Sequence, residues 1–165
     1  MNAFLLLPVC TLLLHLHCAV FTYRYFLARF PELCILACDD DDDDDDKTGN
    51  DTEPIACVVG KIDSEEPAEE GDAVKKTGYI GMLAVVSSHR RKGIGSALVE
   101  RVLRRMRDMG CTSVTLETEV SNAAAQRLYQ DTFGFVREEL LVRYYLNWGD
   151  AYRLRLWFAS ENEKV

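Results

Sequence analysis

The sequence predicts an α/β fold in which a mixed central β-sheet is flanked by helices. Apolar runs of strand length alternate with stretches of helical periodicity along most of the 165 residues, which is the order typical of α/β proteins. In addition, a glycine-containing turn at residues 90–96 joins one apolar run to an amphipathic helix. At this length the chain is most simply one domain, large enough to bury a real core.

The first half of the chain is expected to form a helix and three strands. Residues 20–27 are rich in aromatic side chains and open a helix that ends before Pro31. Leu33–Ala37 is a short apolar run, and Ile55–Ile62 is enriched in β-branched side chains; both patterns favour strands. Gly78–Val86 is almost continuously apolar, as expected of a strand covered on both faces.

The second half is expected to form a helix, a strand, a short helix and two strands. From Ile94 to Gly110 apolar side chains recur at helical spacing, and Ser113–Thr118 is the next strand. Asn122 is suited to cap a short helix that carries residues 123–129 and that Gly134 ends. The last two strands are expected at 135–146 and 151–158, around a turn at 147–150.

Charge is strongly segregated along the chain. The formal net charge is −8, and Asp39–Asp46 supplies eight negative charges, so the remainder sums to zero. This low-complexity, self-repelling run predicts a solvated loop over 39–53, and residues 63–76 form a second acidic loop without periodicity. Residues 90–107 carry seven basic side chains against one acidic side chain. That balance suits a small polyanionic ligand, while no nucleic-acid-binding motif accompanies it.

The cysteines and the N-terminal segment bear on the cellular compartment. The six cysteines form no paired C-x-x-C set, and Cys34-x-x-x-Cys38 alone is a weak zinc signal, so no metal site is predicted. Such scattered cysteines are typical of reduced thiols in a cytosolic protein. Residues 1–20 are apolar but interrupted by Pro8, and this run is too short and broken to span a bilayer as a helix. Three interpretations of it stay open: a signal peptide lacking its basic region, an element packed into the core, or a mispredicted gene start.

The turn at residues 90–96 predicts a pyrophosphate cradle. Gly93 and Gly95 lack a Cβ, so a ligand can approach the backbone closely. The following helix supplies unpaired N–H groups and the positive end of its dipole. The alternative is an ordinary tight turn with a solvated basic edge. The predicted phosphate-binding residues are Arg90, Arg91, Lys92, Gly93, Ile94, Gly95 and Ser96.

Several stretches resemble the acetyl-CoA-dependent GNAT acyltransferase superfamily, whose fold the chain is therefore expected to adopt. They are the strand GYIGMLAV, the turn RRKGIG, the segment LETEVSNAAAQRLY and the GF that follows. Three further stretches resemble the catalytic subunits of N-terminal acetyltransferase C (NatC): FTYRYFLARFPELC at 21–34, LETEVSNAAA at 116–125 and RYYLNWGDAYRLRLW at 143–157. The likeness covers residues 21–158 apart from the two acidic loops. It implies a GNAT domain over 21–160 and a short tail at 161–165.

The resemblance implies transfer of an acetyl group from acetyl-CoA, as co-substrate, to the α-amino group of a protein N-terminus. The implied substrates retain methionine followed by a bulky apolar residue. The implied partners are nascent chains, a large auxiliary subunit, a small subunit and, through the complex, the ribosome in the cytoplasm, with no membrane. Two other classes stay open. One is a GNAT enzyme for small amines or lysine side chains, and the other is a non-catalytic acyl-CoA-binding module.

The resemblance also assigns the reacting groups. An α-amino group is mostly protonated at neutral pH, so a base must accept its proton. Glu117 matches the family's base, and Glu119, on the same strand face by the two-residue period, is its rival. The alternative is that one or both of them only pair with nearby arginines. Tyr129 matches the general acid that protonates the CoA thiolate. The thioester oxygen is assigned to the main chain of Leu83, Ala84 and Val85, and Asn122 either contacts the cofactor or only caps its helix.

Peptide recognition is implied at two aromatic segments, and two departures affect it. Phe21, Tyr23 and Tyr25 match the loop that receives the first substrate residues, while Tyr144 and Tyr145 match the opposite side. Because residues 1–20 depart from the family pattern, the sequence does not establish the family's N-terminal strand or the whole peptide groove. One residue more than in the family separates Tyr129 from Gly134. We expect this insertion to lengthen the helix-to-strand turn without moving the Tyr129 hydroxyl.

Overall fold

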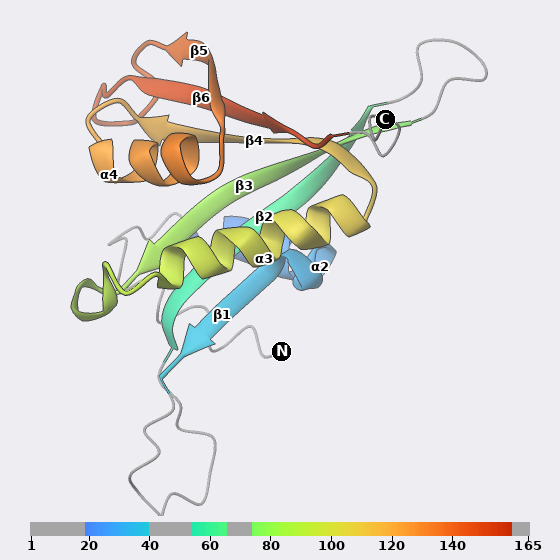
Figure 1. Cartoon of the computed structure of the whole chain (residues 1–165), viewed down its shortest axis with the longest axis horizontal. Helices are drawn as coiled ribbons and strands as arrows, with labels where there is room; N and C mark the ends of the chain where they lie inside the picture. Colours follow the sequence, from blue (N-terminus) through green and yellow to red (C-terminus); the bar gives the residue numbers. More distant parts are fainter. Residues whose placement is uncertain (1–18, 40–53, 66–73, 160–165) are drawn as a thin grey trace, which may run out of the picture. The chain divides into compact units, whose positions relative to one another are not determined.

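The structure is a computed structural model of the chain and describes residues 19–39, 54–65 and 74–159. Figure 1 shows the arrangement of the helices and strands. The helices are α2 Ala19–Arg29, α3 Ile94–Asp108 and α4 Ala123–Gln126, with short 3-10 turns at Pro31–Leu33 and Ser87–His89 and a π-helical segment at Arg127–Thr132. The strands are β1 Cys34–Cys38, β2 Pro54–Glu65, β3 Lys75–Val85, β4 Cys111–Glu119, β5 Val136–Leu141 and β6 Ala151–Trp157.

The described strands form one mixed sheet. Their order is β1-β2-β3-β4-β6-β5. Strand β3 runs parallel to β4, whereas β1–β2, β4–β6 and β5–β6 are antiparallel pairs. The predicted mixed sheet with flanking helices is confirmed, as is the predicted order of the elements from β1 to β6.

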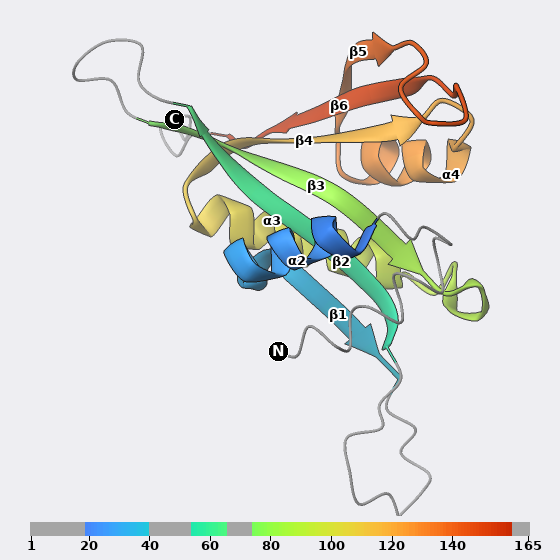
Figure 2. The same ribbon diagram turned by 180° about the vertical axis from the view of Figure 1, so that it is seen from behind.

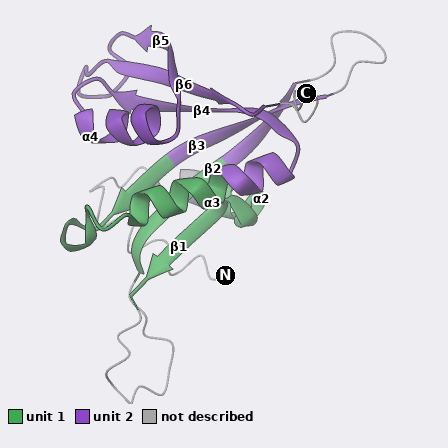
Figure 3. Ribbon diagram, in the orientation of Figure 1, with its two compact units in different colours: residues 1–60, 82–102 green, residues 61–81, 103–165 purple. Residues whose placement is uncertain are grey.

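The chain divides into two compact units, residues 1–60 with 82–102 and residues 61–81 with 103–165 (Figure 3). In the first unit, α2 lies over one face of β1 and β2, and the start of α3 lies over the other face (Figures 1 and 2). Burial of apolar side chains, each worth about 1.5–3 kcal/mol, fixes this packing. The fully buried members include Leu33, Val58, Val59, Val99 and Val102.

The second unit contains the start of β3, the end of α3 and all later elements. Met106, Val114, Leu116 and Leu154 are fully buried there. Gly78 has a packing role, because a Cβ built on it would lie 2.5 Å from the Met106 sulfur. The short helix α4 lies on one side of the β4–β6–β5 sheet (Figures 1 and 2).

The structure corrects several element bounds. Strand β2 continues to Glu65 and β3 begins at Lys75, so the second acidic loop is shorter than the expected 63–76. Of β3 only Gly78 and Ile80 are buried, so the expectation of a strand covered on both faces was wrong. Residues 1–18, most of the Asp run, and 66–73 lie outside the described residues, and the expectations made for them stay predictions.

Candidate active site

The predicted phosphate turn lies between β3 and α3 in the first unit. Two of its residues have left-handed backbone conformations, Arg91 at φ 61° and Gly93 at φ 82°. Nothing lies within 4 Å of the position a Gly93 Cβ would occupy, and the Gly93 carbonyl accepts the first helical hydrogen bond, from Ala97 at 3.0 Å. The turn therefore leaves open space at a helix N-terminus beside three cations, which are the features expected of a phosphate cradle.

The end of β3 precedes this turn. Leu83, Ala84 and Val85 are only partly buried, so their side chains are not core as the sequence had suggested. The Val85 carbonyl accepts a 3.0 Å hydrogen bond from Arg90 Nε, which ties the turn to the strand. His89, just before the turn, is partly buried and contacts Asp39 at 2.9 Å.

Glu117, the predicted base, lies on β4 in the second unit. Its side chain is 9% exposed, so its carboxylate depends on hydrogen bonds for stability. Tyr79 donates to Oε2 at 2.8 Å, and Arg153 Nε donates to Oε1 at 3.1 Å. Each carboxylate oxygen has further lone-pair capacity, so Glu117 can still accept a proton from a substrate.

Tyr79 and Arg153 are residues that sequence reasoning missed. Tyr79 reads as one more apolar position of a strand, and Arg153 as one more solvated cation. The β4–β6 register places Arg153 directly opposite Glu117, and cross-strand partners share a sheet face. A prediction of the strand pairing with its register would have found this contact.

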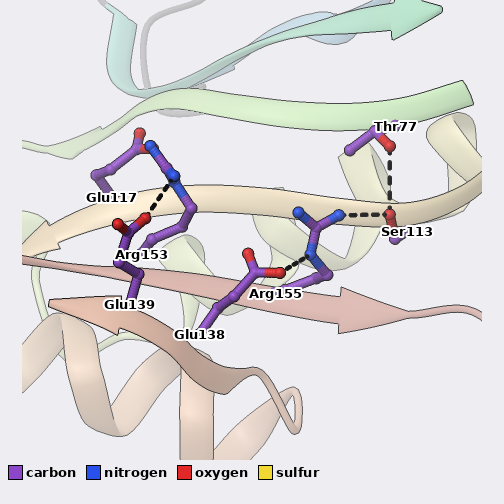
Figure 4. A network of polar contacts seen from close by, with 7 residues as sticks. All are labelled: Thr77, Ser113, Glu117, Glu138, Glu139, Arg153 and Arg155. Atoms are coloured by element: carbon purple, nitrogen blue, oxygen red, sulfur yellow. Dashed lines mark hydrogen bonds and ion pairs between the residues drawn. The ribbon is translucent and has the colours of Figure 1, made fainter. Parts of the chain in front are cut away.

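Two rows of polar contacts cross β4, β6 and β5 (Figure 4). In the first row Arg153 joins Glu117 to Glu139. The Glu139 Oε2 accepts a hydrogen bond from Arg153 Nη1 at 2.7 Å. In the second row Arg155 joins Ser113 to Glu138 at 3.1 and 2.8 Å. Only the first row contains a predicted catalytic residue.

Tyr129, the predicted general acid, is buried in the π-helical segment and packs edge-on against Phe135. The Phe135 N–H donates to the Tyr129 carbonyl at 2.9 Å, which closes the turn that contains the extra residue. The insertion is thus absorbed within the helix as a π-helical turn, where we had expected a longer helix-to-strand turn. Burial, with a smaller contribution from Tyr145, raises the pKa of the Tyr129 hydroxyl well above its usual range.

Asn122 caps α4, as predicted. Its Oδ1 accepts a hydrogen bond from the Ala125 N–H at 3.1 Å, which satisfies one of the free donors at the helix start. The cap is geometrically sufficient to explain the residue. A contact between Asn122 and a cofactor stays a prediction.

Tyr144 and Tyr145 lie in the loop after β5 and not on a strand, because β5 ends at Leu141. Their rings meet edge-on at 5.2 Å. Burial and the nearby charge of Glu117 raise the pKa of Tyr144. Burial and then Tyr144, Glu119 and Glu117 raise the pKa of Tyr145. The charge of Glu117 thus acts on both tyrosines of this loop, and Tyr145 acts in turn on Tyr129.

The remaining predicted residues are placed as follows. Phe21, Tyr23 and Tyr25 lie on helix α2 instead of a loop. The Tyr25 side chain is exposed and packs edge-on against Phe26, whereas the side chains of Phe21 and Tyr23 lie outside the described residues. Glu119, the rival base, accepts a long hydrogen bond of 3.5 Å from Asn147.

The described residues contain neither a candidate metal site nor a candidate membrane-spanning helix. Within these ranges no three His, Cys, Asp or Glu side chains are grouped so that they could hold a metal ion. No helix in the same part of the chain has the length and apolar character needed to cross a membrane.

Comparison with known proteins identifies the fold and the chemistry. The sequence profile of the acetyltransferase (GNAT) family matches residues 7–135. The chain belongs to this family. The GNAT fold predicted from the sequence motifs is also confirmed by a crystal structure of the NatC complex bound to Gag peptide and CoA. One chain of that complex matches with a TM-score of 0.70 and 41% identity, over 85% of this chain and 80% of the other.

Curated relatives refine the position of the chain within the GNAT family. N-alpha-acetyltransferase 30 of Saccharomyces cerevisiae is 43% identical over 138 residues, which is 84% of this chain and 71% of that protein. The human N-alpha-acetyltransferase 30 is 41% identical over 139 residues, but these cover only 33% of its length. The predicted resemblance to the NatC catalytic subunit is confirmed, and with it the assignment of the chain as an N-alpha-acetyltransferase, a class of acyltransferase.

Proposed function

We propose that this GNAT protein transfers the acetyl group of acetyl-CoA to the α-amino group of protein N-termini that begin with methionine and a bulky apolar residue. The observation that carries the proposal is the cluster around Glu117. The Glu117 carboxylate is shielded from water and accepts hydrogen bonds from Tyr79 and Arg153. Its charge also acts on Tyr144 and Tyr145. Such a cluster joins a proton acceptor to aromatic walls with polar tips.

The reaction requires two proton transfers around one acyl transfer. The substrate amine attacks the thioester carbonyl carbon, a C–N bond forms, and the C–S bond breaks. Glu117 takes the proton that the amine loses, directly or through water, and Tyr129 gives its phenolic proton to the departing thiolate. Solvent then returns a proton from Glu117 to Tyr129, so the products are the N-acetylated peptide and free CoA.

In this proposal the turn at 90–96, the end of β3 and Asn122 bind the other parts of acetyl-CoA. Residues 90–96 hold the pyrophosphate through backbone N–H groups and cations. The main chain of Leu83–Val85 stabilises the thioester oxygen as negative charge develops on it. Asn122 contacts the cofactor in addition to capping α4.

Substrate recognition is assigned to the aromatic side chains at both ends of the sequence. Tyr144 and Tyr145 bind the first two side chains from one side, and Phe21, Tyr23 and Tyr25 bind them from the other. Large aromatic surfaces with hydroxyl tips suit a methionine side chain and a second apolar residue while holding the peptide backbone. The chain works as the catalytic subunit of a cytoplasmic complex with a large auxiliary and a small subunit, and acts on nascent chains at the ribosome.

The decisive experiment measures acetylation of peptides by the full chain, alone and with the two NatC partner subunits. Peptides beginning Met-Leu or Met-Ile should be acetylated at the α-amino group, and peptides beginning Met-Lys or Ser-Leu much less. Equal acetylation of free amines or lysine side chains would favour the GNAT class for small amines. Acetyl-CoA binding without any turnover would favour a non-catalytic module.

Variants test the assigned roles. The double variant Glu117→Gln/Tyr129→Phe should lose at least about a thousandfold in kcat while CoA still binds, because both proton transfers are removed. The matched control is Glu119→Gln, on the same strand face, which should retain kcat within about threefold because its carboxylate is only partly buried and accepts a single long hydrogen bond from Asn147. Full activity of the double variant would contradict the mechanism. A large loss of kcat in Glu119→Gln would assign the role of base to Glu119 instead.

A further inference from the structure

We propose that Arg153 is a positioning residue that orients Glu117, and that Glu139 acts on Arg153 as a counter-charge. The inference rests on the proposed function, since it concerns the base of that reaction. It is carried by the juxtaposition of three charged side chains across three strands.

The strand register aligns the three side chains. Glu117 on β4 and Glu139 on β5 are both cross-strand partners of Arg153 on the intervening β6. Partners at one register position point to the same face of a sheet. The fold therefore builds a Glu–Arg–Glu row in which the cation lies between two carboxylates.

The two carboxylates of the row differ in exposure. The Glu117 side chain is 9% exposed and the Glu139 side chain 52% exposed, with Arg153 between them at 36%. The shorter contact, 2.7 Å, goes to the exposed Glu139, and the 3.1 Å contact goes to Glu117. Arg153 thus donates a hydrogen bond to the enclosed Glu117 through Nε, while the other end of its guanidinium donates to the solvated carboxylate of Glu139.

A β-bulge makes this arrangement possible. Successive residues of a regular strand point to opposite faces, yet the neighbours Glu138 and Glu139 both pair with arginines of β6. The β5–β6 register shifts between Arg137 and Glu139, and a bulge of this kind re-aims a side chain. The strand has an irregularity where Glu139 meets Arg153.

Among the described residues, Tyr79 from β3 and Arg153 from β6 donate hydrogen bonds to the Glu117 carboxylate. The nearby cation Lys61 lies over the Tyr79 ring, 5.3 Å from its centroid. Arg153 is thus the cation that contacts Glu117 directly, and its planar guanidinium is suited to fix the orientation of a carboxylate.

The test compares variants of the full chain, together with the two NatC partner subunits, and begins with cofactor binding. Arg153→Gln and Glu139→Gln should bind CoA as tightly as the parent chain, within about twofold, because neither residue belongs to the predicted cofactor-binding set. Calorimetry provides this measurement.

Activity supplies the second readout. Arg153→Gln should lower kcat about tenfold or more with the KM for acetyl-CoA within about twofold, because the base is misplaced and cofactor contacts are intact. Glu139→Gln should leave kcat within about threefold of the parent chain, because Arg153 still contacts Glu117. Arg153→Lys should recover part of kcat.

The second row of Figure 4 offers matched controls on the same two strands. Glu138→Gln and Arg155→Gln remove equivalent charges next to Ser113 instead of Glu117 and should leave kcat close to that of the parent chain. An equal loss of kcat in these controls, an unchanged kcat in Arg153→Gln, or no recovery in Arg153→Lys would overturn the inference. An inactive parent chain would overturn the proposed function as well.

Discussion

At the scale of single residues, Tyr129 combines deep burial with a hydroxyl that no described residue engages in a hydrogen bond. Burial raises the pKa of this hydroxyl well above its usual range. Because its pKa is raised, the Tyr129 phenol stays protonated at neutral and mildly alkaline pH. Tyr129 therefore keeps its proton in the mildly alkaline range where the substrate amine, with a pKa of about 8, becomes neutral.

The pH profile and the Tyr129→Phe variant test this role. In the parent chain kcat/KM should rise through the pKa of the peptide amine, about 8, and stay level to about pH 10, because Tyr129 keeps its proton. Tyr129→Phe should lower kcat about a hundredfold and change the free energy of unfolding by less than about 1 kcal/mol, because no hydrogen bond is lost. Steady-state kinetics and urea unfolding check both. A descending limb near pH 9, or a large loss of stability, would contradict the assignment.

At the scale of elements, the order of helices and strands was predictable because each apolar run is bounded by turn residues. The segment after β5 shows where this reasoning ends. Val142 to Leu146 has strand-like composition, but Arg143 adopts φ 54° and its N–H donates to the Asp150 carboxylate at 2.7 Å. The side chain of Asp150, eight positions after Val142, thus ends the strand. No local sequence pattern predicts this contact.

The residues of the candidate site also differ in whether a local sequence pattern predicts them. Glu117, Tyr129 and the turn at 90–96 carry local motifs, so they could be predicted. Tyr79 and Arg153 depend on strand register, which is set by long-range pairing. The π-helical turn is a further case: the spacing showed the extra residue, but whether the helix or the following turn absorbs it depends on how Tyr129 and Phe135 pack.

Deletion of Thr132 tests how independent Tyr129 is of that turn. Thr132 is exposed and follows Tyr129, and the Asn122 cap lies before it, so the deletion should let the segment become α-helical without moving the hydroxyl. We expect kcat within about threefold of the parent, since π-turns inserted in helices are local features. Far-UV circular dichroism and kinetics provide the measurement. A folded deletion variant that has lost most of its activity would show that the π-turn itself places Tyr129.

At the scale of the whole molecule, the two compact units share elements along the chain. The boundaries between the units fall within β2, after Gly60, within β3, after Gly81, and within α3, after Val102. Unfolding of either unit would therefore break two strands and a helix that the other also uses. We infer that the chain unfolds in one cooperative transition despite its division.

Cysteine labelling can measure this cooperativity, because each unit contains a buried thiol. Cys57 belongs to the first unit and Cys111 to the second, and burial raises the pKa of Cys111 to about 11. Since the thiolate is the reactive form, N-ethylmaleimide near neutral pH should modify the exposed Cys38 and spare both buried thiols. With increasing urea, Cys57 and Cys111 should become reactive over the same concentration range, as peptide mass mapping would show. Cys57→Ala and Cys111→Ala identify the peptides, and labelling of one thiol at clearly lower urea than the other would establish two separately unfolding units.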